Sequence, residues 1–371
     1  MSDPLISFII PAKNRRDLLA ETLGSLVAQS EPRWEGIVVD DGSTDGTIGY
    51  VRAAAREDER IRLVRRAGPA TGACAARNQG FAASRANLIV FLDSDDIMES
   101  FAVAERVAAM NERPDVDYLV TQARCFRRTP GDMAALWNTD PATTTPDTPD
   151  EDLDRFLSRD IPWQTTGPTW RRSAVERIGP WHEQAPSGQD LDYHVRALLL
   201  GLRYDRTRSY DFHWRVGGAA RGSIGLASIR AAHWRWRAVL AERLLFMIRR
   251  AGRLTERRRL LVGGAFWNAA DNVRQRAGIR EASRIWDRAR VLGLISTRQW
   301  LEGTAYILGF FQRHLREPAR RWIEGHWPDE LLLEPSATQT NAPLPPAWEE
   351  AARSRREASD RLVFPQNRVK L

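Results

Sequence analysis

The chain has 371 residues with a formal net charge of +7, and 43% of its residues are hydrophobic. This length accommodates one large α/β domain with an appendage or two ordinary domains, and the composition excludes wholesale disorder. The two cysteines give no metal-binding or disulfide framework. The apolar runs are shorter than the roughly 18–20 residues that span a bilayer, and residues 1–11 are typical of a strand rather than a signal peptide. We therefore expect a cytoplasmic protein.

The first hundred residues alternate short apolar runs with helical patterns. The apolar runs cover residues 6–10, 36–39, 61–64 and 88–92, and helical spacing follows over 17–29, 45–57, 73–84 and 101–111. This alternation predicts a mostly parallel sheet with helices on both faces. Ligands of such sheets bind beyond the carboxyl ends of the strands, so the polar residues that follow the apolar runs are the candidate site.

The remainder of the chain is less regular at first and then helical. Strands are predicted over residues 118–126 and 204–216, a helix over 190–200, and a loop over 129–152, which is rich in Pro, Thr and Asp. Helical patterns continue from Leu226 to Gly325, and the last residues have the composition of a loose tail. The predicted divisions are a domain at 1–222, a basic, tryptophan-rich helical region at 223–333 and a tail at 334–371.

Positive charge is concentrated in the helical region. Between Leu226 and Gly325 there are 21 arginines, no lysine and eight acidic residues, whereas the rest of the chain is mildly acidic. Such a region either binds an anionic partner, for example anionic lipid headgroups, a lipid-linked diphosphate or nucleic acid, or is a solvated arginine-rich surface.

Two acidic clusters directly follow apolar runs. Asp40 and Asp41 come after the second run, and Asp93, Asp95 and Asp96 come after the fourth. Three carboxylates within four residues repel one another, and a bound divalent cation relieves that repulsion. Mg²⁺ and Mn²⁺ accept one or two carboxylates together with substrate phosphates. Each cluster taken alone is equally compatible with a turn that caps the following helix.

Three later segments carry further candidate groups. Arg77 lies in a helix of small residues, Asp190 opens a helix, and His213 and Arg215 lie on a strand that is followed by Arg221. Arginine suits a diphosphate, a positioned aspartate can act as a general base, and histidine is a candidate metal ligand. Taken singly, a surface arginine, an N-cap aspartate and a structural histidine explain these residues as well.

The clusters, in this order over about residues 5–223, resemble the inverting glycosyltransferases of family two, which have the GT-A nucleotide-diphospho-sugar transferase fold. The resemblance is carried by residues 6–15, 39–45, 72–80, 91–96 and 189–190. It implies an α/β fold with a Rossmann-like, mostly parallel sheet covered by helices on both faces, to which this chain adds a C-terminal helical extension.

The resemblance also implies roles for individual residues. Pro11 and Asn14 would border the nucleotide of the donor, and Asp41 would recognise its base. Arg77 would support the donor site, and Asp93 would lie near the ribose and the diphosphate. Asp95, with Asp93, would bind Mn²⁺ or Mg²⁺, and Asp190 would be the catalytic base. To these we add, from their chemistry alone, His213 as a metal ligand and Arg215 and Arg221 at the diphosphate.

Three positions depart from the family pattern. Lys13 stands where the family often has an aromatic residue that stacks on the base, and Gln189 stands where it often has glutamate. Gly217, two residues after Arg215, stands where a histidine is usual. The first departure concerns the stacking of the base, and the second concerns the charge next to Asp190.

The activity implied by the resemblance is transfer of a sugar, most simply from a UDP-sugar, to a hydroxyl of a sugar or lipid-linked glycan acceptor with inversion. Such an activity would serve cell-surface polysaccharide or glycoconjugate synthesis. Trp163, Trp170 and Trp181 are candidates to bind the acceptor, because aromatic faces pack on sugar rings, or else they are core anchors. The basic helices can lie on the inner face of the membrane, close the acceptor site or form a homodimer.

Two other classes of protein would explain only part of the sequence. A non-catalytic nucleotide-sugar-binding or scaffolding protein on the same fold would not need both the acidic cluster and Asp190. A nucleic-acid-binding protein would leave the N-terminal clusters unexplained, and the sequence has no recognisable nucleic-acid module. We therefore expect an enzyme and no nucleic-acid partner.

Overall fold

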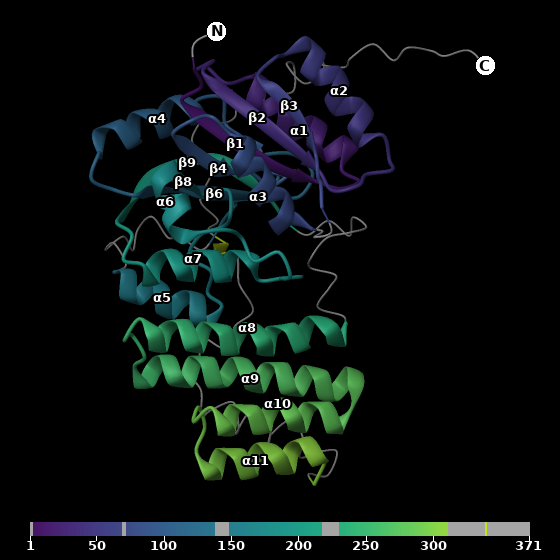
Figure 1. Cartoon of the computed structure of the whole chain (residues 1–371), viewed down its shortest axis with the longest axis vertical. Helices are drawn as coiled ribbons and strands as arrows, with labels where there is room; N and C mark the ends of the chain where they lie inside the picture. The colour runs from purple at the N-terminus through teal and green to yellow at the C-terminus, as the bar shows by residue number, and fades with distance from the viewer. Residues whose placement is uncertain (1–2, 69–71, 138–147, 217–229, 311–337, 340–371) are drawn as a thin grey trace, which may run out of the picture.

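A computed structural model describes the arrangement of residues 3–68, 72–137, 148–216, 230–310 and 338–339. A twisted sheet with helices on both faces occupies one end of the molecule, and a stack of long helices occupies the other (Figure 1). Two helices, α5 and α7, lie between the sheet and the stack (Figure 1).

Four parallel strands form the half of the sheet that comes first in the chain. Their order in space is β3 (Ile61–Arg65), β2 (Trp34–Asp40), β1 (Ile6–Ala12) and β4 (Leu88–Phe91). β1 lies in register with β2 from Ile6 opposite Trp34 to Ala12 opposite Asp40. The polar segments that follow these strands therefore meet at one edge of the sheet, as the sequence predicted.

Beyond β4 the sheet is mixed rather than parallel. β8 (Pro168–Arg171) is antiparallel to β4, β6 (Tyr118–Phe126) is antiparallel to β8, and β9 (Tyr204–Arg215) runs parallel to β6. Three two-residue strands complete the sheet: β5 (Ile97–Met98) beside β9, β7 (Ala135–Leu136) beside β6, and β10 (Thr338–Gln339) beside β7. The pairing of β9 with β5 and β6 returns the segment around His213 to the end of β4.

Alternate residues of the central strands face opposite layers of helices. Phe8 and Val90 pack with α1 (Arg16–Val27), α2 (Thr47–Glu57) and α4 (Ala102–Glu112). Ile9 and Phe91 belong to the cluster that contains residues of α3 (Ala73–Ala83), α6 (Arg172–Ile178) and α7 (Gln189–Leu199). Both faces of the sheet are thus covered, which explains why its central strands are mainly apolar.

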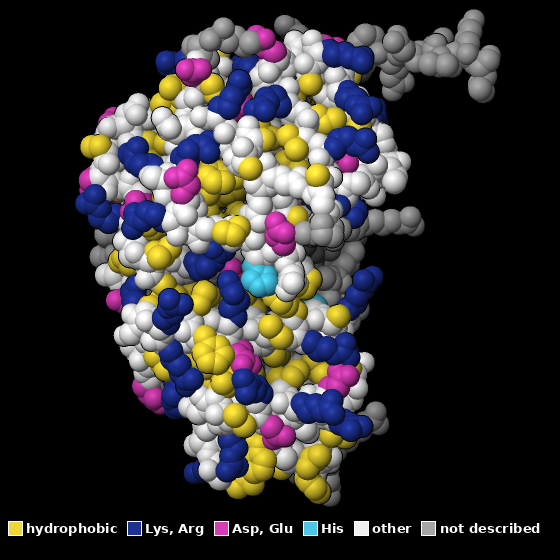
Figure 2. Space-filling model, viewed as in Figure 1, with side chains coloured by type: hydrophobic (Ala, Val, Ile, Leu, Met, Phe, Trp, Pro, Cys, Tyr) yellow, Lys and Arg dark blue, Asp and Glu magenta, His cyan; other side chains and the backbone are white. Residues whose placement is uncertain are grey.

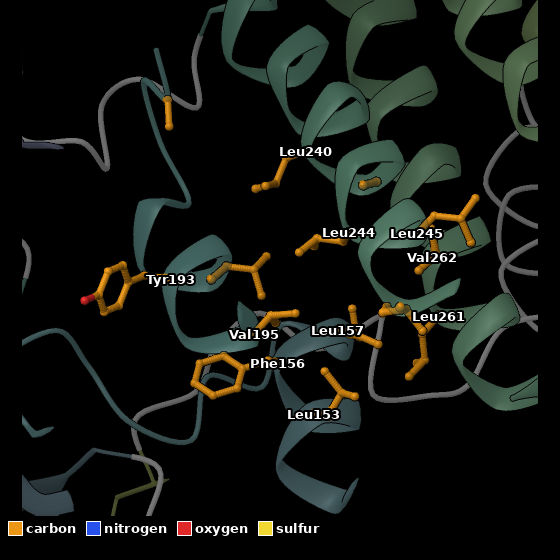
Figure 3. Packing of buried hydrophobic residues seen from close by; sticks show 14 of the residues in the cluster. Leu153, Phe156, Leu157, Tyr193, Val195, Leu240, Leu244, Leu245, Leu261 and Val262 are labelled. Carbon is orange, nitrogen blue, oxygen red and sulfur yellow. The ribbon is translucent and has the colours of Figure 1, made fainter. Parts of the chain in front are cut away.

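The C-terminal stack consists of α8 (Ala231–Arg250), α9 (Glu256–Ala277), α10 (Ile279–Val291) and α11 (Thr297–Leu308). Leu153 and Leu157 of α5 (Pro149–Ser158) and Val195 of α7 pack with Leu244 of α8 and Leu261 of α9 (Figure 3). The same apolar cluster runs from the sheet as far as α11. The stack therefore shares a continuous core with the sheet and packs against α7.

α5 begins inside the segment that the sequence analysis predicted to be a loop. The Thr148 hydroxyl accepts the backbone N–H of Glu151 at 3.3 Å, and the Glu151 carboxylate accepts the N–H of Thr148 at 2.6 Å. Pro149 occupies the first helical position, which needs no N–H. The Pro and Asp residues that suggested a loop are thus the start signal of a helix.

Parts of the predicted organisation lie outside the described residues. This holds for 138–147, for the boundary near residue 222, and for the predicted tail apart from residues 338–339. The three-part division of the chain therefore stays a prediction.

Substituting Gly80 tests the close contact between α3 and the sheet. An added Cβ would lie 2.4 Å from Cγ2 of Ile9 and 3.1 Å from Cγ2 of Val39. Overpacking of this kind costs about 1–3 kcal/mol, more than the gain of about 1 kcal/mol from helix propensity. We expect Gly80→Ala to lower the free energy of unfolding in chemical denaturation. Gly49→Ala on α2, where the Cβ meets open space, should raise it, and equal stabilities for the two variants would contradict the packing.

Candidate active site

The segments after β1 and β2 are tied together by Asn14. Asn14 adopts a left-handed backbone conformation with φ of 52°. Its N–H donates to the Ser43 hydroxyl at 2.9 Å, and its side-chain oxygen accepts the N–H of Thr44 at 2.8 Å. Pro11, in β1, is half-buried beside this turn. The two residues predicted to border the nucleotide therefore lie at the expected edge of the sheet.

Asp41 is a buried carboxylate at the end of β2 with several partners. It accepts the N–H of Gly72 at 3.0 Å, just before α3, and forms ion pairs with Arg66 and, at 3.5 Å, with Lys13. A carboxylate offers about four acceptor positions, so Asp41 can still accept an N–H from a ligand. Lys13, which replaces the expected aromatic residue, contributes a charge here rather than a stacking surface.

Arg77 joins the two ends of the candidate site. Its Nη2 donates to Oδ1 of Asp93 at 2.7 Å, and its Nη1 donates to Oε1 of Gln189 at 3.0 Å. The guanidinium lies 4.6 Å from the centroid of the Trp181 ring, and the Gln189 amide is oriented by the Ala185 carbonyl at 3.0 Å. Residues from β4 and from the start of α7 are thus held by one buried side chain.

Asp190 occupies the first turn of α7, directly after this contact. Gly188 precedes the helix in the left-handed conformation, with φ of 64°, and Asp190 is half-buried. A helix N-terminus favours a carboxylate because of its unpaired N–H groups and its dipole. Since Gln189 binds Arg77 and Arg77 binds Asp93, the residue that precedes Asp190 is linked to the end of β4.

The acidic cluster after β4 carries strong mutual repulsion. Burial and the neighbouring Asp93 raise the pKa of Asp95 above its usual value, although the charges of Arg15 and Arg215 oppose the shift. Burial and the charges of Asp93 and Asp95 raise the pKa of Asp96 well above the usual range. Asp96 accepts the Thr166 hydroxyl at 2.6 Å, while within the described ranges its Oδ1 has no partner. Asp96 is therefore a structural member of the cluster.

Asp93 and Asp95 can supply two ligands to a divalent cation, with phosphate oxygens of the donor completing its coordination. The Asp95 carboxylate has no side-chain hydrogen-bond partner among the described residues. Arg77 occupies only one of the two carboxylate oxygens of Asp93. In the described part of the chain no group of three His, Cys, Asp or Glu residues is assembled for a metal ion. Two carboxylates plus phosphate oxygens are the ligand set that Mg²⁺ commonly uses.

His213, the third residue predicted to bind the metal, is engaged with a carboxylate outside the Asp93–Asp96 segment. Its Nε2 lies 2.6 Å from Oε1 of Glu99, and both side chains are buried. The pair connects β9 to the end of β5. One ring nitrogen of His213 is thus occupied by Glu99, and its role as a metal ligand stays a prediction.

Arg215 lies close to the cluster but has protein partners. Its Nε donates to the Asp95 carbonyl at 3.1 Å, and its Nη2 pairs with Glu21 at 2.7 Å. It also lies 4.3 Å from the centroid of the Phe126 ring. Arg215 therefore contributes a positive field beside Asp95, whereas Arg221 lies outside the described residues.

The three tryptophans proposed as acceptor-binding residues or core anchors are buried, which favours the second alternative. Trp163, Trp170 and Trp181 are each at most 3% exposed. Trp170 packs 4.2 Å from Tyr118 between ring centroids, and Trp181 stacks on Tyr193 at 4.1 Å. Their ring faces are covered by protein, which is the alternative that the sequence left open.

The residues that support the acidic cluster from α4, β9 and the segment before β8 were not predicted from the sequence. The buried Arg106 pairs with Asp211 and donates to the Thr166 carbonyl at 3.0 Å. The Thr166 hydroxyl in turn accepts the N–H of Asp93 at 3.3 Å. No local signal marks these residues, because their contacts depend on the antiparallel pairing of β8 with β4.

A solved structure shares the fold of this chain. Staphylococcus aureus TarS 1-349, crystallised in complex with UDP-GlcNAc, matches 86% of this chain and 90% of its own chain with a TM-score of 0.57. The sequence identity is 16%, so the likeness concerns the fold alone. The fold and the position of the acidic site define a glycosyltransferase fold of the GT-A class.

Sequence comparison assigns the family. Residues 7–179 match glycosyl transferase family 2. The succinoglycan biosynthesis protein ExoU of Rhizobium meliloti is 30% identical over 249 residues, which cover 64% of this chain and 69% of that protein. The O-antigen biosynthesis protein RfbC of Myxococcus xanthus is 28% identical over 60% of this chain but 16% of its own length. The chain belongs to glycosyl transferase family 2, and it spans less than half the length of several further curated relatives.

Proposed function

We propose that the chain transfers a sugar from a nucleotide-diphospho-sugar to an acceptor hydroxyl with inversion of the anomeric configuration. The observation that carries this proposal is the contact of Arg77 with both Asp93 and Gln189. It links Asp93, the proposed donor contact, to Gln189, which directly precedes the proposed base Asp190. The membership of the chain in glycosyl transferase family 2 supports the reaction class.

The proposed reaction is a single displacement. The acceptor oxygen bonds to the anomeric carbon as the bond from that carbon to the diphosphate oxygen breaks, and the nucleoside diphosphate leaves. Asp190 takes the proton of the acceptor hydroxyl. Arg77 orients Asp93 at the donor, and the charge of Arg215 beside the cluster favours bound phosphate. A divalent cation held by Asp95 and Asp93 would supply Lewis-acid stabilisation of the leaving diphosphate.

A uridine diphosphate sugar is the proposed donor, and polysaccharide synthesis is the proposed context. TarS 1-349 was crystallised with UDP-GlcNAc and with UDP. ExoU and RfbC are named for succinoglycan and O-antigen biosynthesis. We carry these properties over to this chain as proposals.

We also propose that the helical stack contacts the inner face of an anionic membrane. Among the described helices none combines the length and apolarity needed to cross a bilayer. Basic side chains are spread over the face seen in Figure 2, and apolar side chains gather at the far end of the stack. The exposed large apolar residues of the stack include Val239, Phe246, Val291, Leu301 and Leu308. A homodimer through the same face stays the competing prediction.

Asp190→Asn tests the base. The amide cannot take a proton, so we expect the turnover number to fall by about 10²–10⁴-fold, while the affinity for uridine diphosphate with Mn²⁺ changes little. Release of uridine diphosphate from the donor in the presence of acceptor measures turnover, and calorimetry measures binding. Glu176→Gln, an exposed position on α6, is the matched control. Full turnover by Asp190→Asn would remove Asp190 from this role.

Removal of divalent cations tests the metal site. We expect EDTA to abolish transfer and added Mn²⁺ or Mg²⁺ to restore it. Asp95→Asn should raise the Mn²⁺ concentration needed for half-maximal activity by about tenfold or more, in line with the loss of one of few ligands. Glu59→Gln, an exposed carboxylate far from the cluster in sequence, should leave that concentration unchanged. Undiminished activity in EDTA would exclude the metal from the reaction.

A further inference from the structure

Helix α8 reaches the turn that precedes Asp190. The Trp236 indole N–H donates to the Ser187 carbonyl at 2.8 Å. A Cβ on Gly188 would lie 2.6 Å from Nη1 of Arg237 and 2.8 Å from Cδ2 of Leu240. The Arg237 guanidinium is therefore packed against the backbone two residues before the proposed base, and glycine is needed at position 188 for this approach as well as for its φ of 64°.

Arg237 differs from the other inward-facing arginines of this region. Arg243 pairs with Asp192 at 2.6 Å, and Arg258 pairs with Asp154 at 2.6 Å. Arg237, by contrast, forms no hydrogen bond or ion pair with any described residue, and its Nε is buried without a partner. Asp190 attracts it electrostatically without forming an ion pair. A mostly buried cation without a partner is costly unless a ligand completes it.

The surroundings of Arg237 are strongly positive. Burial and the charge of Arg159 lower the pKa of Arg237 to about 10. Burial and the charges of Arg237, Arg159 and Arg276 lower the pKa of His233 to about 4. Arg159 and Arg276 both approach the Trp234 ring, at 5.7 and 6.0 Å from its centroid. A site of this charge favours an anion.

A pocket opens at this position between α5, α7, α8 and α9. Arg159, Trp234, Arg237 and Asn268 provide its polar and aromatic lining. Leu240 and Leu244, which Figure 3 shows on the side of α8 that faces α7, contribute to its apolar wall. The pocket thus combines a cationic group beside Asp190 with an apolar surface.

We propose that this pocket binds an anionic group of the acceptor, a phosphate or a carboxylate, with Arg237 as its ion-pairing partner. The proposal rests on the proposed glycosyl transfer and names the class of acceptor. The anion would be held on the α8 side of the α7 N-terminus, while the attacking hydroxyl of the same acceptor reaches Asp190. Arg237 would thus select acceptors that carry an anionic group. The anion can come from an acidic sugar or from the phosphate of a lipid carrier.

Anion binding is tested with the full chain saturated with uridine diphosphate and Mg²⁺, so that the donor site is filled. Thermal unfolding is then followed during titration with glucuronate or with farnesyl phosphate, at constant ionic strength. Glucose and farnesol are the neutral counterparts. We expect at least one anion to raise the melting temperature and neither neutral compound to do so.

The variants assign the effect to Arg237. Arg237→Met keeps the apolar stem and removes the charge, and should weaken anion binding by about tenfold or more. Arg237→Lys should retain part of the affinity, which keeps the test valid if the methionine variant folds poorly. Arg250→Met, at the exposed end of the same helix, should bind as the wild type does.

The two anions distinguish the possible sources of the acceptor charge. Stabilisation by glucuronate alone assigns the anion to the glycan, and stabilisation by farnesyl phosphate alone assigns it to a lipid carrier. Stabilisation by neither anion, or equal binding by wild type and Arg237→Met, would overturn the proposal. Failure of uridine diphosphate itself to stabilise the wild type would count instead against the proposed function.

Discussion

The arrangement of the candidate site depends on the buried guanidinium of Arg77. A buried cation is stabilised by pairing and hydrogen bonds, and the two Nη groups of Arg77 find partners in Asp93 and Gln189. Its planar fork can serve two acceptors at once, which a lysine ammonium does less well. The position of α7, and with it the position of Asp190, is thus linked to the end of β4 by one side chain.

The helical stack also contacts α7 and the loop before it. α7 packs between the sheet and α8, and Asp192 is paired with Arg196 and Arg243. Trp236 fixes the loop before α7 through the Ser187 carbonyl. Because the apolar cluster is continuous from the sheet into the stack, the C-terminal helices are part of what places the proposed base.

Much of the parallel half of the fold and the edge that bears the site could be predicted from the sequence. Apolar runs ending in Asp40 and Asp93 specify buried parallel strands with polar groups at their carboxyl ends, and this pattern is local. The contacts that depend on tertiary pairing could not be predicted. His213 pairs with Glu99 because β9 returns beside β5, and Trp170 is buried because β8 is inserted antiparallel to β4. The partnerless Arg237 is likewise visible only once α8 is seen against Gly188.

We propose that Asp93 and the turn before Asp190 form one site through Arg77. Calorimetric titration of uridine diphosphate with Mn²⁺ into the wild type, Arg77→Met, Gln189→Leu and the double variant measures this directly. We predict that the wild type binds uridine diphosphate and that each single variant binds it more weakly. The double variant should bind no more weakly than Arg77→Met, which corresponds to a coupling free energy between the two positions of about 0.5 kcal/mol or more. Additive losses, or a wild type that does not bind uridine diphosphate, would contradict it.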